Sequence, residues 1–132
     1  MNKLIAVTAL IASIIISPAS AAPLTDEEKS YITIELGSLS VANICGYSVV
    51  RGSLSKLGDQ MGVDDRIGTA AIEALKVGMG TDYDRAMLIP EVTRFVNETV
   101  DYMATASRNR EAYCRKFAPV LLDRGTIEKK TH

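Results

Sequence analysis

TDEEKSYITIELGSLSVANICGYSVVRGSLSKLGDQM, residues 25–61, is the stretch that decides the fold of this chain. Thr25 followed by Glu28 is a capping box, which predicts a helix that begins near Asp26. Apolar and small residues then recur at steps of three and four, and a second apolar set follows the opposite side. The first set is Leu36, Ser40, Asn43, Tyr47, Val50, Leu54, Leu57 and Met61, and the second is Ile34, Val41, Cys45 and Val49. A helix that is apolar on two sides is expected at the centre of a fold.

Glycines interrupt this stretch at four positions. They are Gly37, Gly46, Gly52 and Gly58. Each costs about 1 kcal/mol relative to alanine inside a helix. Such glycines either let a neighbouring helix approach closely or mark a break in the helix. We expect a break or kink between Gly46 and Gly58.

The next two helical segments are marked by a cap and a stop. Asp64 is expected as the N-cap of a second helix with a small-residue face, which ends at residues 78–80 (Gly-Met-Gly). Thr81 then precedes a short helix over residues 83–89. Pro90 is suited to the first turn of the following helix, where its missing N–H costs nothing.

The last two helices are predicted from the spacing of apolar residues and from residues that begin or end helices. Residues at strict helical spacing predict an amphipathic helix after Pro90, namely Val92, Phe95, Val96, Thr99, Val100 and Met103. Ser107 is expected to cap the last helix, Pro119 to kink or end it, and Gly125 to stop it. We find no alternating strand pattern. The expected fold is all-α, a small bundle of four to five helices in one domain over residues 22–125, with a flexible tail over residues 126–132.

Residues 1–21 have the three parts of a cleavable secretory signal peptide. Lys3 supplies the positive start, residues 4–16 are almost wholly apolar, and residues 17–21 (Ser-Pro-Ala-Ser-Ala) offer small residues for cleavage. The apolar run is shorter than the roughly 20 residues that cross a bilayer. The alternative is an uncleaved anchor. The expected location is periplasmic or secreted.

Cys45 and Cys114 are the only cysteines. An even count in an exported chain predicts a disulfide, here between the first and last helices. The spacing does not match a redox or zinc motif. Two buried free thiols are the alternative. The bridge would close a loop of about 70 residues, which stabilises a fold by about 4 kcal/mol on the chain-entropy model.

Composition and charge narrow the classes of function. The chain has 15 basic and 16 acidic residues, which argues against a nucleic-acid protein, and it has no tryptophan. The only histidine is His132, so a Ser-His-Asp or Cys-His catalytic site is not expected. The carboxylates at residues 64–65 and at 82 and 84 are interpreted as caps and turn residues. We therefore expect no enzyme, no catalytic residues, no metal and no cofactor.

A cluster of basic residues is the candidate surface for a partner. It consists of Arg108, Arg110, Arg115 and Lys116. Arginine makes bidentate contacts with carboxylates, so the cluster suits an acidic partner. Alternatively it neutralises the acidic start of the first helix, or forms a solvated face.

Asn43 and Tyr47 are neighbours on the apolar stripe and form the candidate small-molecule pocket. A polar residue in such a stripe also fixes helix register, and core packing is the commoner explanation of both positions.

Two resemblances bear on function. The leader, the size and the two distant cysteines resemble the small periplasmic acid-stress chaperones. Residues 45–47 (Cys-Gly-Tyr) with a helical body resemble the periplasmic immunity proteins directed against amidase effectors. Neither resemblance transfers functional residues to this chain. The leading hypothesis is a non-enzymatic exported module of inhibitor or immunity type that binds a periplasmic or extracellular protein. A stress chaperone and a small-ligand carrier are the alternatives, and the oligomeric state stays open.

Overall fold

A computed structural model describes residues 22–131 of the chain, so the predicted signal peptide lies outside the described residues. Within this range the chain forms five α-helices, one short 3-10 helix and one two-stranded sheet. In chain order these are α3 (Asp26–Cys45), β1 (Tyr47–Val49), α4 (Ser53–Met61), α5 (Asp65–Met79), η1 (Arg85–Met87), α6 (Pro90–Ala106), α7 (Arg110–Arg124) and β2 (Ile127–Lys129). The predicted all-α bundle is confirmed.

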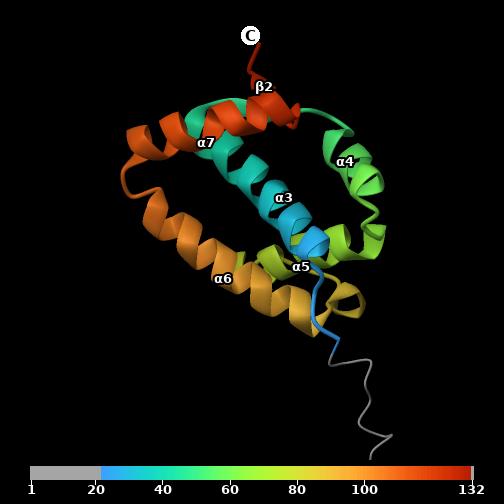
Figure 1. Cartoon of the computed structure of the whole chain (residues 1–132). Coiled ribbons are helices and arrows are strands. Elements are labelled where there is room, and N and C mark those ends of the chain that lie inside the picture. The colour runs from blue at the N-terminus through green and yellow to red at the C-terminus, as the bar shows by residue number, and fades with distance from the viewer. Residues whose placement is uncertain (1–21, 132) are drawn as a thin grey trace, which may run out of the picture.

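Helix α3 runs through the middle of the molecule (Figure 1). It begins with the predicted capping box, in which the Glu28 N–H donates to Thr25 Oγ1 at 3.1 Å and the Thr25 N–H donates to Glu28 Oε1 at 2.8 Å. Its first half joins α5 and α6 in one buried cluster, and its second half joins α7 and β2 in another. One helix serves two cores, which explains its two apolar sides.

The predicted break in the first helical stretch is confirmed, and the structure places it at residues 46–52. Gly46 ends α3 with φ +77°, and Gly52 precedes α4 with φ +78°. Side chains other than glycine rarely adopt this left-handed conformation. The apolar stripe that ran on through Tyr47 and Val50 is therefore not one helix face, because the chain is extended between the two glycines.

The predicted disulfide joins Cys45, at the end of α3, to Cys114 in α7, with Cα atoms 5.7 Å apart. Two further contacts fasten α7 across the second half of α3. Arg110 Nε donates to the Ile44 carbonyl at 2.8 Å, and the Ser40 and Tyr113 hydroxyls are hydrogen bonded at 2.9 Å.

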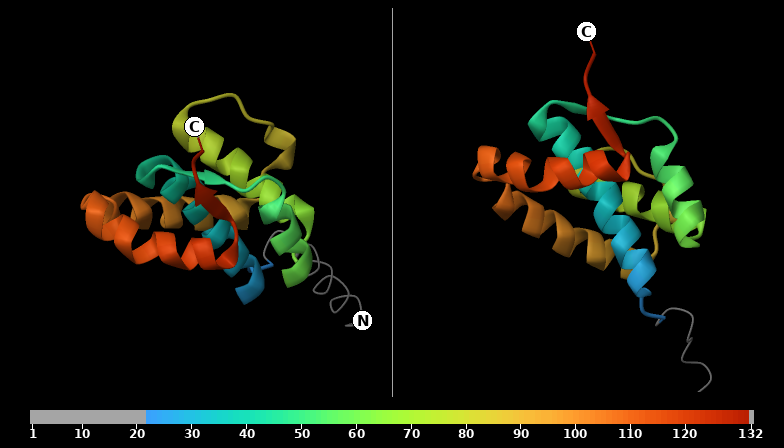
Figure 2. Two further views of the ribbon diagram at one scale, coloured as in Figure 1. Left: turned by 90° about the horizontal axis from the view of Figure 1, so that it is seen from above. Right: turned by 45° about the horizontal axis from the view of Figure 1, so that its top comes forward.

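The prediction of a flexible tail from residue 126 is wrong for residues 126–129. Strand β2 pairs antiparallel with β1, and Ile127 lies opposite Val49. The pairing strands are seen from above in Figure 2. Thr126 and Ile127 are only 1% and 2% exposed. Strands of three residues are too short to give an alternating pattern, so the sequence alone showed neither strand.

Three local predictions also need correction. Ser107 ends α6 rather than capping α7, whose N-cap is Asn109, with its side chain accepting from the Ala112 N–H at 3.0 Å. Pro119 does not end α7, which continues to Arg124, and Gly125 stops the helix as predicted. The short helix after Thr81 is the single 3-10 turn η1. The caps at Asp64 and Gly80 are as predicted, and Pro90 lies in the first turn of α6 as expected. In the part of the chain that the structure describes, no helix is both long and apolar enough to span a membrane.

Candidate functional site

An acidic cavity of about 480 Å³ lies among α3, α4 and α5. Its lining includes the buried residues Tyr31, Glu35 and Glu73, and the exposed residues Asp64 and Asp65. Of the described residues that line it, four are carboxylic acids and none is a lysine or an arginine. The cavity thus presents one sign of charge, and sequence analysis did not identify it.

The cavity depends on two residues one helical turn apart on α3 and on two glycines that pack against one of them. Tyr31 and Glu35 are four residues apart, so they are neighbours on one face of α3. Gly58 of α4 and Gly68 of α5 lie against the Tyr31 ring, where an added Cβ atom would come within 3.2 Å of ring atoms. The absence of side chains at both glycines lets α4 and α5 pack around this aromatic ring.

Glu35 is the unusual group of the cavity. It is 5% exposed, and its Oε1 has no hydrogen-bond partner within residues 22–131. Burial raises the pKa of its carboxyl to about 8, because the charged form loses its hydration. Glu35 is therefore largely protonated at neutral pH. Buried polar atoms normally have hydrogen-bond partners, so this oxygen is an exception within the described chain.

Three other ionisable groups around the cavity, Glu73, Asp64 and Tyr31, are hydrogen bonded or neutral. Glu73 accepts hydrogen bonds from the Asp84 N–H at 2.7 Å and from Lys76 Nζ at 2.9 Å, which lower its pKa. The Arg66 N–H likewise lowers the pKa of Asp64. Burial, followed by the charge of Glu35, raises the pKa of Tyr31 to about 12, so its phenol is neutral.

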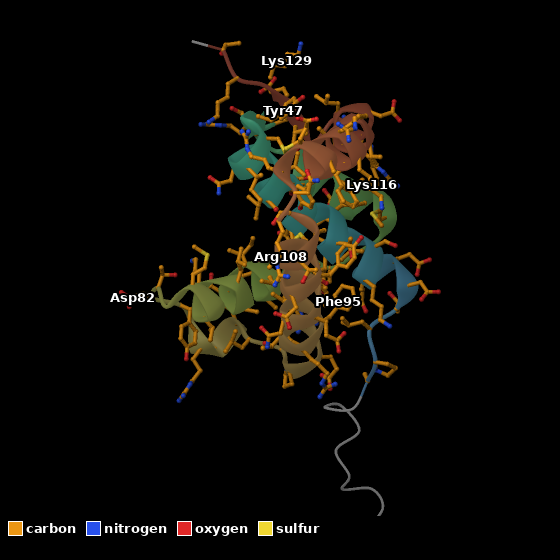
Figure 3. All side chains as sticks on the ribbon, turned by 90° about the vertical axis from the view of Figure 1, so that its left-hand side faces the viewer. Tyr47, Asp82, Phe95, Arg108, Lys116 and Lys129 are labelled. Atoms are coloured by element: carbon orange, nitrogen blue, oxygen red, sulfur yellow. A yellow bond between two sulfur atoms is a disulfide. The ribbon has the colours of Figure 1, made fainter. Side chains whose placement is uncertain are left out.

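A second feature is the projection formed by residues 77–87, all of which are exposed. It carries four large apolar side chains, namely Val77, Met79, Tyr83 and Met87. Asp82 lies at its outer end, far from Tyr47 and Lys116 (Figure 3). The hydrogen bond from the Asp84 N–H to Glu73 ties this segment back to α5. Sequence analysis divided the same residues between a helix end and a short helix, and gave them no role.

The two predicted pocket residues do not share a cavity. Asn43 lines an apolar cavity of about 520 Å³ among α3, α5 and α6, together with Met79 and Met103. Tyr47 lies in β1, opposite Lys129 of β2, and packs against the cluster around α7. The two residues separate because the chain leaves the helix at Gly46.

Three of the four residues of the predicted basic cluster make separate side-chain contacts. Arg110 bonds the Ile44 carbonyl, Arg115 pairs with Glu111 at 3.2 Å, and Lys116 Nζ lies 5.3 Å from the Phe117 ring centroid. Arg108 precedes α7 in the turn after α6. Because successive helix residues rotate by about 100°, residues 110, 115 and 116 do not share one face of α7.

Among the described residues, no group of three or more histidines, cysteines, aspartates or glutamates is placed to hold a metal ion. Comparisons of the chain with family models, curated proteins and solved structures give no match. The acidic cavity and the projection are therefore the two candidate functional features of the described chain.

Proposed function

We propose that this protein is an exported, non-enzymatic module that binds another protein through the projection of residues 77–87. The observation that carries the proposal is the density of apolar side chains there. Four of the seven large apolar side chains that are exposed in the described chain fall within these eleven consecutive residues. Exposed apolar patches of this kind typically mark interaction sites, and tyrosine and methionine are enriched in interfaces.

The projection is held in shape before any partner binds. Glu73 accepts from the Asp84 N–H, and Asp84 Oδ1 in turn accepts from the Ala86 N–H at 3.0 Å. Thr81 Oγ1 donates to the Lys76 carbonyl at 3.3 Å. A segment that is already ordered loses less conformational entropy on binding, which favours affinity. This supports an inhibitor-type module that inserts a rigid segment into the cleft of its partner.

The disulfide and the predicted leader both support a compartment outside the cytoplasm. The Cys45–Cys114 disulfide is typical of an oxidising, non-cytoplasmic environment. Combined with the predicted signal peptide, it supports a periplasmic or secreted protein. Its partner would then be a periplasmic or extracellular protein.

The test compares two surfaces of the same protein. Tagged variants would be cross-linked in the native periplasm, captured and analysed by mass spectrometry. The wild type should capture one dominant partner in an amount close to its own. The double variant Tyr83→Ala/Met87→Ala should no longer capture that partner. Tyr102→Ala is the matched control, because Tyr102 is also an exposed tyrosine but lies on α6, outside the projection.

A third variant tests the basic cluster. Arg115→Ser/Lys116→Ser removes the two cations whose contacts with the protein are local. Loss of the partner with this variant, and retention with the Tyr83→Ala/Met87→Ala variant, would move the binding surface to α7. Arg110 is left intact because it bonds the Ile44 carbonyl, so its loss would disturb the fold.

A small-ligand carrier is a second candidate, and the apolar cavity beside Asn43 favours it. A ligand that fills this cavity should raise the melting temperature, and a Met103→Trp variant that fills the cavity should remove that shift. The acid-triggered chaperone gains no support from Glu35. Because burial raises the pKa of this carboxyl from 4.5 to about 8, its contribution makes the folded state more stable as the pH falls through this range.

A further inference from the structure

We propose that the cavity among α3, α4 and α5 binds a small organic cation through an ammonium group, with Glu35 as its counter-ion. The proposal needs no protein partner, although the cavity and the projection share Glu73, which lines the cavity and accepts from the Asp84 N–H. It rests on the unpartnered oxygen of Glu35, on the sign of charge around the cavity and on the size of the cavity.

The first argument is the unsatisfied oxygen. Glu35 lines the cavity with only 5% of its surface exposed, and its Oε1 accepts no hydrogen bond from the described residues. An ammonium group has three N–H donors and no acceptor, so it complements a carboxylate oxygen. A hydrogen bond between two charged groups is stronger than one between neutral groups, and more so away from bulk water.

The second argument is charge, because the ionisable groups that line the cavity or lie beside it on α3, α4 and α5 are mostly acidic. Helix α3 supplies Tyr31 and Glu35 itself, and α4 supplies Asp59 near the Tyr31 phenol. Helix α5 supplies Asp65 and Glu73, and Asp64 is the N-cap residue just before it. The two cations nearby are each paired with one of these carboxylates, Arg66 with Asp64 at 3.5 Å and Lys76 with Glu73 at 2.9 Å. Glu35 is left without a protein cation, and the surrounding potential attracts one from solution.

The third argument is size and ligand type. A volume of about 480 Å³ is far larger than the roughly 30 Å³ that a water molecule occupies, so it accommodates an organic molecule. The carboxylates do not form a metal-binding group among the described residues. Leu54, Val63 and Ile72 line the cavity beside the acids and offer apolar contact to an alkyl chain. An alkylammonium ion matches both kinds of surface.

Binding should be linked to a proton. The empty cavity keeps Glu35 largely protonated at pH 7, because burial holds its pKa near 8. A bound ammonium group favours the carboxylate and lowers that pKa, so a proton is released on binding. The dissociation constant should therefore fall as the pH rises from 6 toward 8 and then level off.

The experiment is isothermal titration calorimetry on the purified protein with its disulfide intact. The probes are 1,5-diaminopentane, Nα-acetyl-lysine amide and the neutral 1,5-pentanediol. The proposal predicts that at least one of the two cations binds, that the diol does not, and that binding at pH 7 releases close to one proton. Binding of the diamine alone indicates a free amine as the natural ligand, and binding of the lysine derivative indicates a protein side chain.

Glu35→Gln should raise the dissociation constant at least tenfold and abolish the proton release, whereas Glu128→Gln on the exposed strand β2 should change neither. If Glu35→Gln fails to fold, Asp65→Asn at the exposed rim tests the same cavity, with an expected two- to threefold weaker binding. No binding of either cation at millimolar concentration, or cation binding that both Glu35→Gln and Asp65→Asn leave unchanged, would overturn the proposal.

Discussion

Ser38 and Thr126 are 88 positions apart in the chain, and their side-chain hydroxyls share a buried hydrogen bond of 2.7 Å. Both residues are almost wholly inaccessible to solvent. The bond joins the central helix α3 to the residue just before β2. It shows that the C-terminal segment is part of the packed domain.

Removing either hydroxyl should destabilise the protein. Ser38→Ala or Thr126→Val leaves the partner hydroxyl buried without a bond, which costs about 1–3 kcal/mol. The free energy of unfolding from urea titration measures the effect. The double variant should lose less than the sum of the single variants, because it leaves no unpaired group. Thr105→Val on the exposed surface of α6 is the control and should change stability little.

The disulfide is expected to be a major source of stability. Cys45 and Cys114 are separated by 69 positions, and closing so long a loop stabilises a domain by about 4 kcal/mol on the chain-entropy model. The Cys45→Ser/Cys114→Ser variant should show a correspondingly lower free energy of unfolding. A reductant should destabilise the wild type to a similar level and leave the variant unaffected. Equal stability of the oxidised and reduced wild type would contradict this prediction.

Stability should decline with rising pH because of Glu35. Its pKa is raised from 4.5 to about 8 by burial, so between these values the folded protein binds more protons at this group than the unfolded chain. The free energy of unfolding therefore falls as the pH rises through this window, and the loss is complete above pH 8. Asp64 and Glu73 have lowered pKa values, so their carboxylates contribute to the free energy of unfolding above the acidic range in which they titrate. That contribution is lost at lower pH, as the two groups become protonated.

Glu35→Gln should remove most of that decline. The neutral amide keeps the shape of the protonated acid, so we expect the variant to be more stable than the wild type at pH 8.5 by on the order of a few kcal/mol. Urea titrations at pH 5 and pH 8.5 measure the difference. The control Glu128→Gln should follow the wild type at both pH values.

Substitutions at two helical glycines test whether steric contact or helix propensity determines the effect of an added Cβ atom on stability. Gly37→Ala adds a Cβ that meets no atom within 4 Å, so it should stabilise α3 by about 0.5–1 kcal/mol. Gly68→Ala places a Cβ 3.2 Å from the buried Tyr31 ring, so it should destabilise by about 1–3 kcal/mol. Thermal unfolding of the two variants decides the point. Stabilisation by Gly68→Ala would mean that the Tyr31 ring moves freely in its site.

The sequence by itself determined the features that depend on neighbouring residues. The capping box at Thr25, the stop at Gly80 and the placement of Pro90 at a helix start are local hydrogen-bond and backbone effects. The disulfide was also predictable, because Cys45 has only Cys114 as a partner. These signals were enough for the fold class and for most helix boundaries.

The tertiary structure alone decided what depends on contacts between distant segments. Pairing of Val49 with Ile127 turned an expected tail into a strand, and three residues on each side carry too little pattern to show it in advance. Glu35 became a candidate site because α4 and α5 bury it. A glutamate on a helix gives no local sign of being buried, since burial is fixed by the elements that pack against it. The same reason explains why Asn43 and Tyr47, neighbours in the stripe, lie in different parts of the fold.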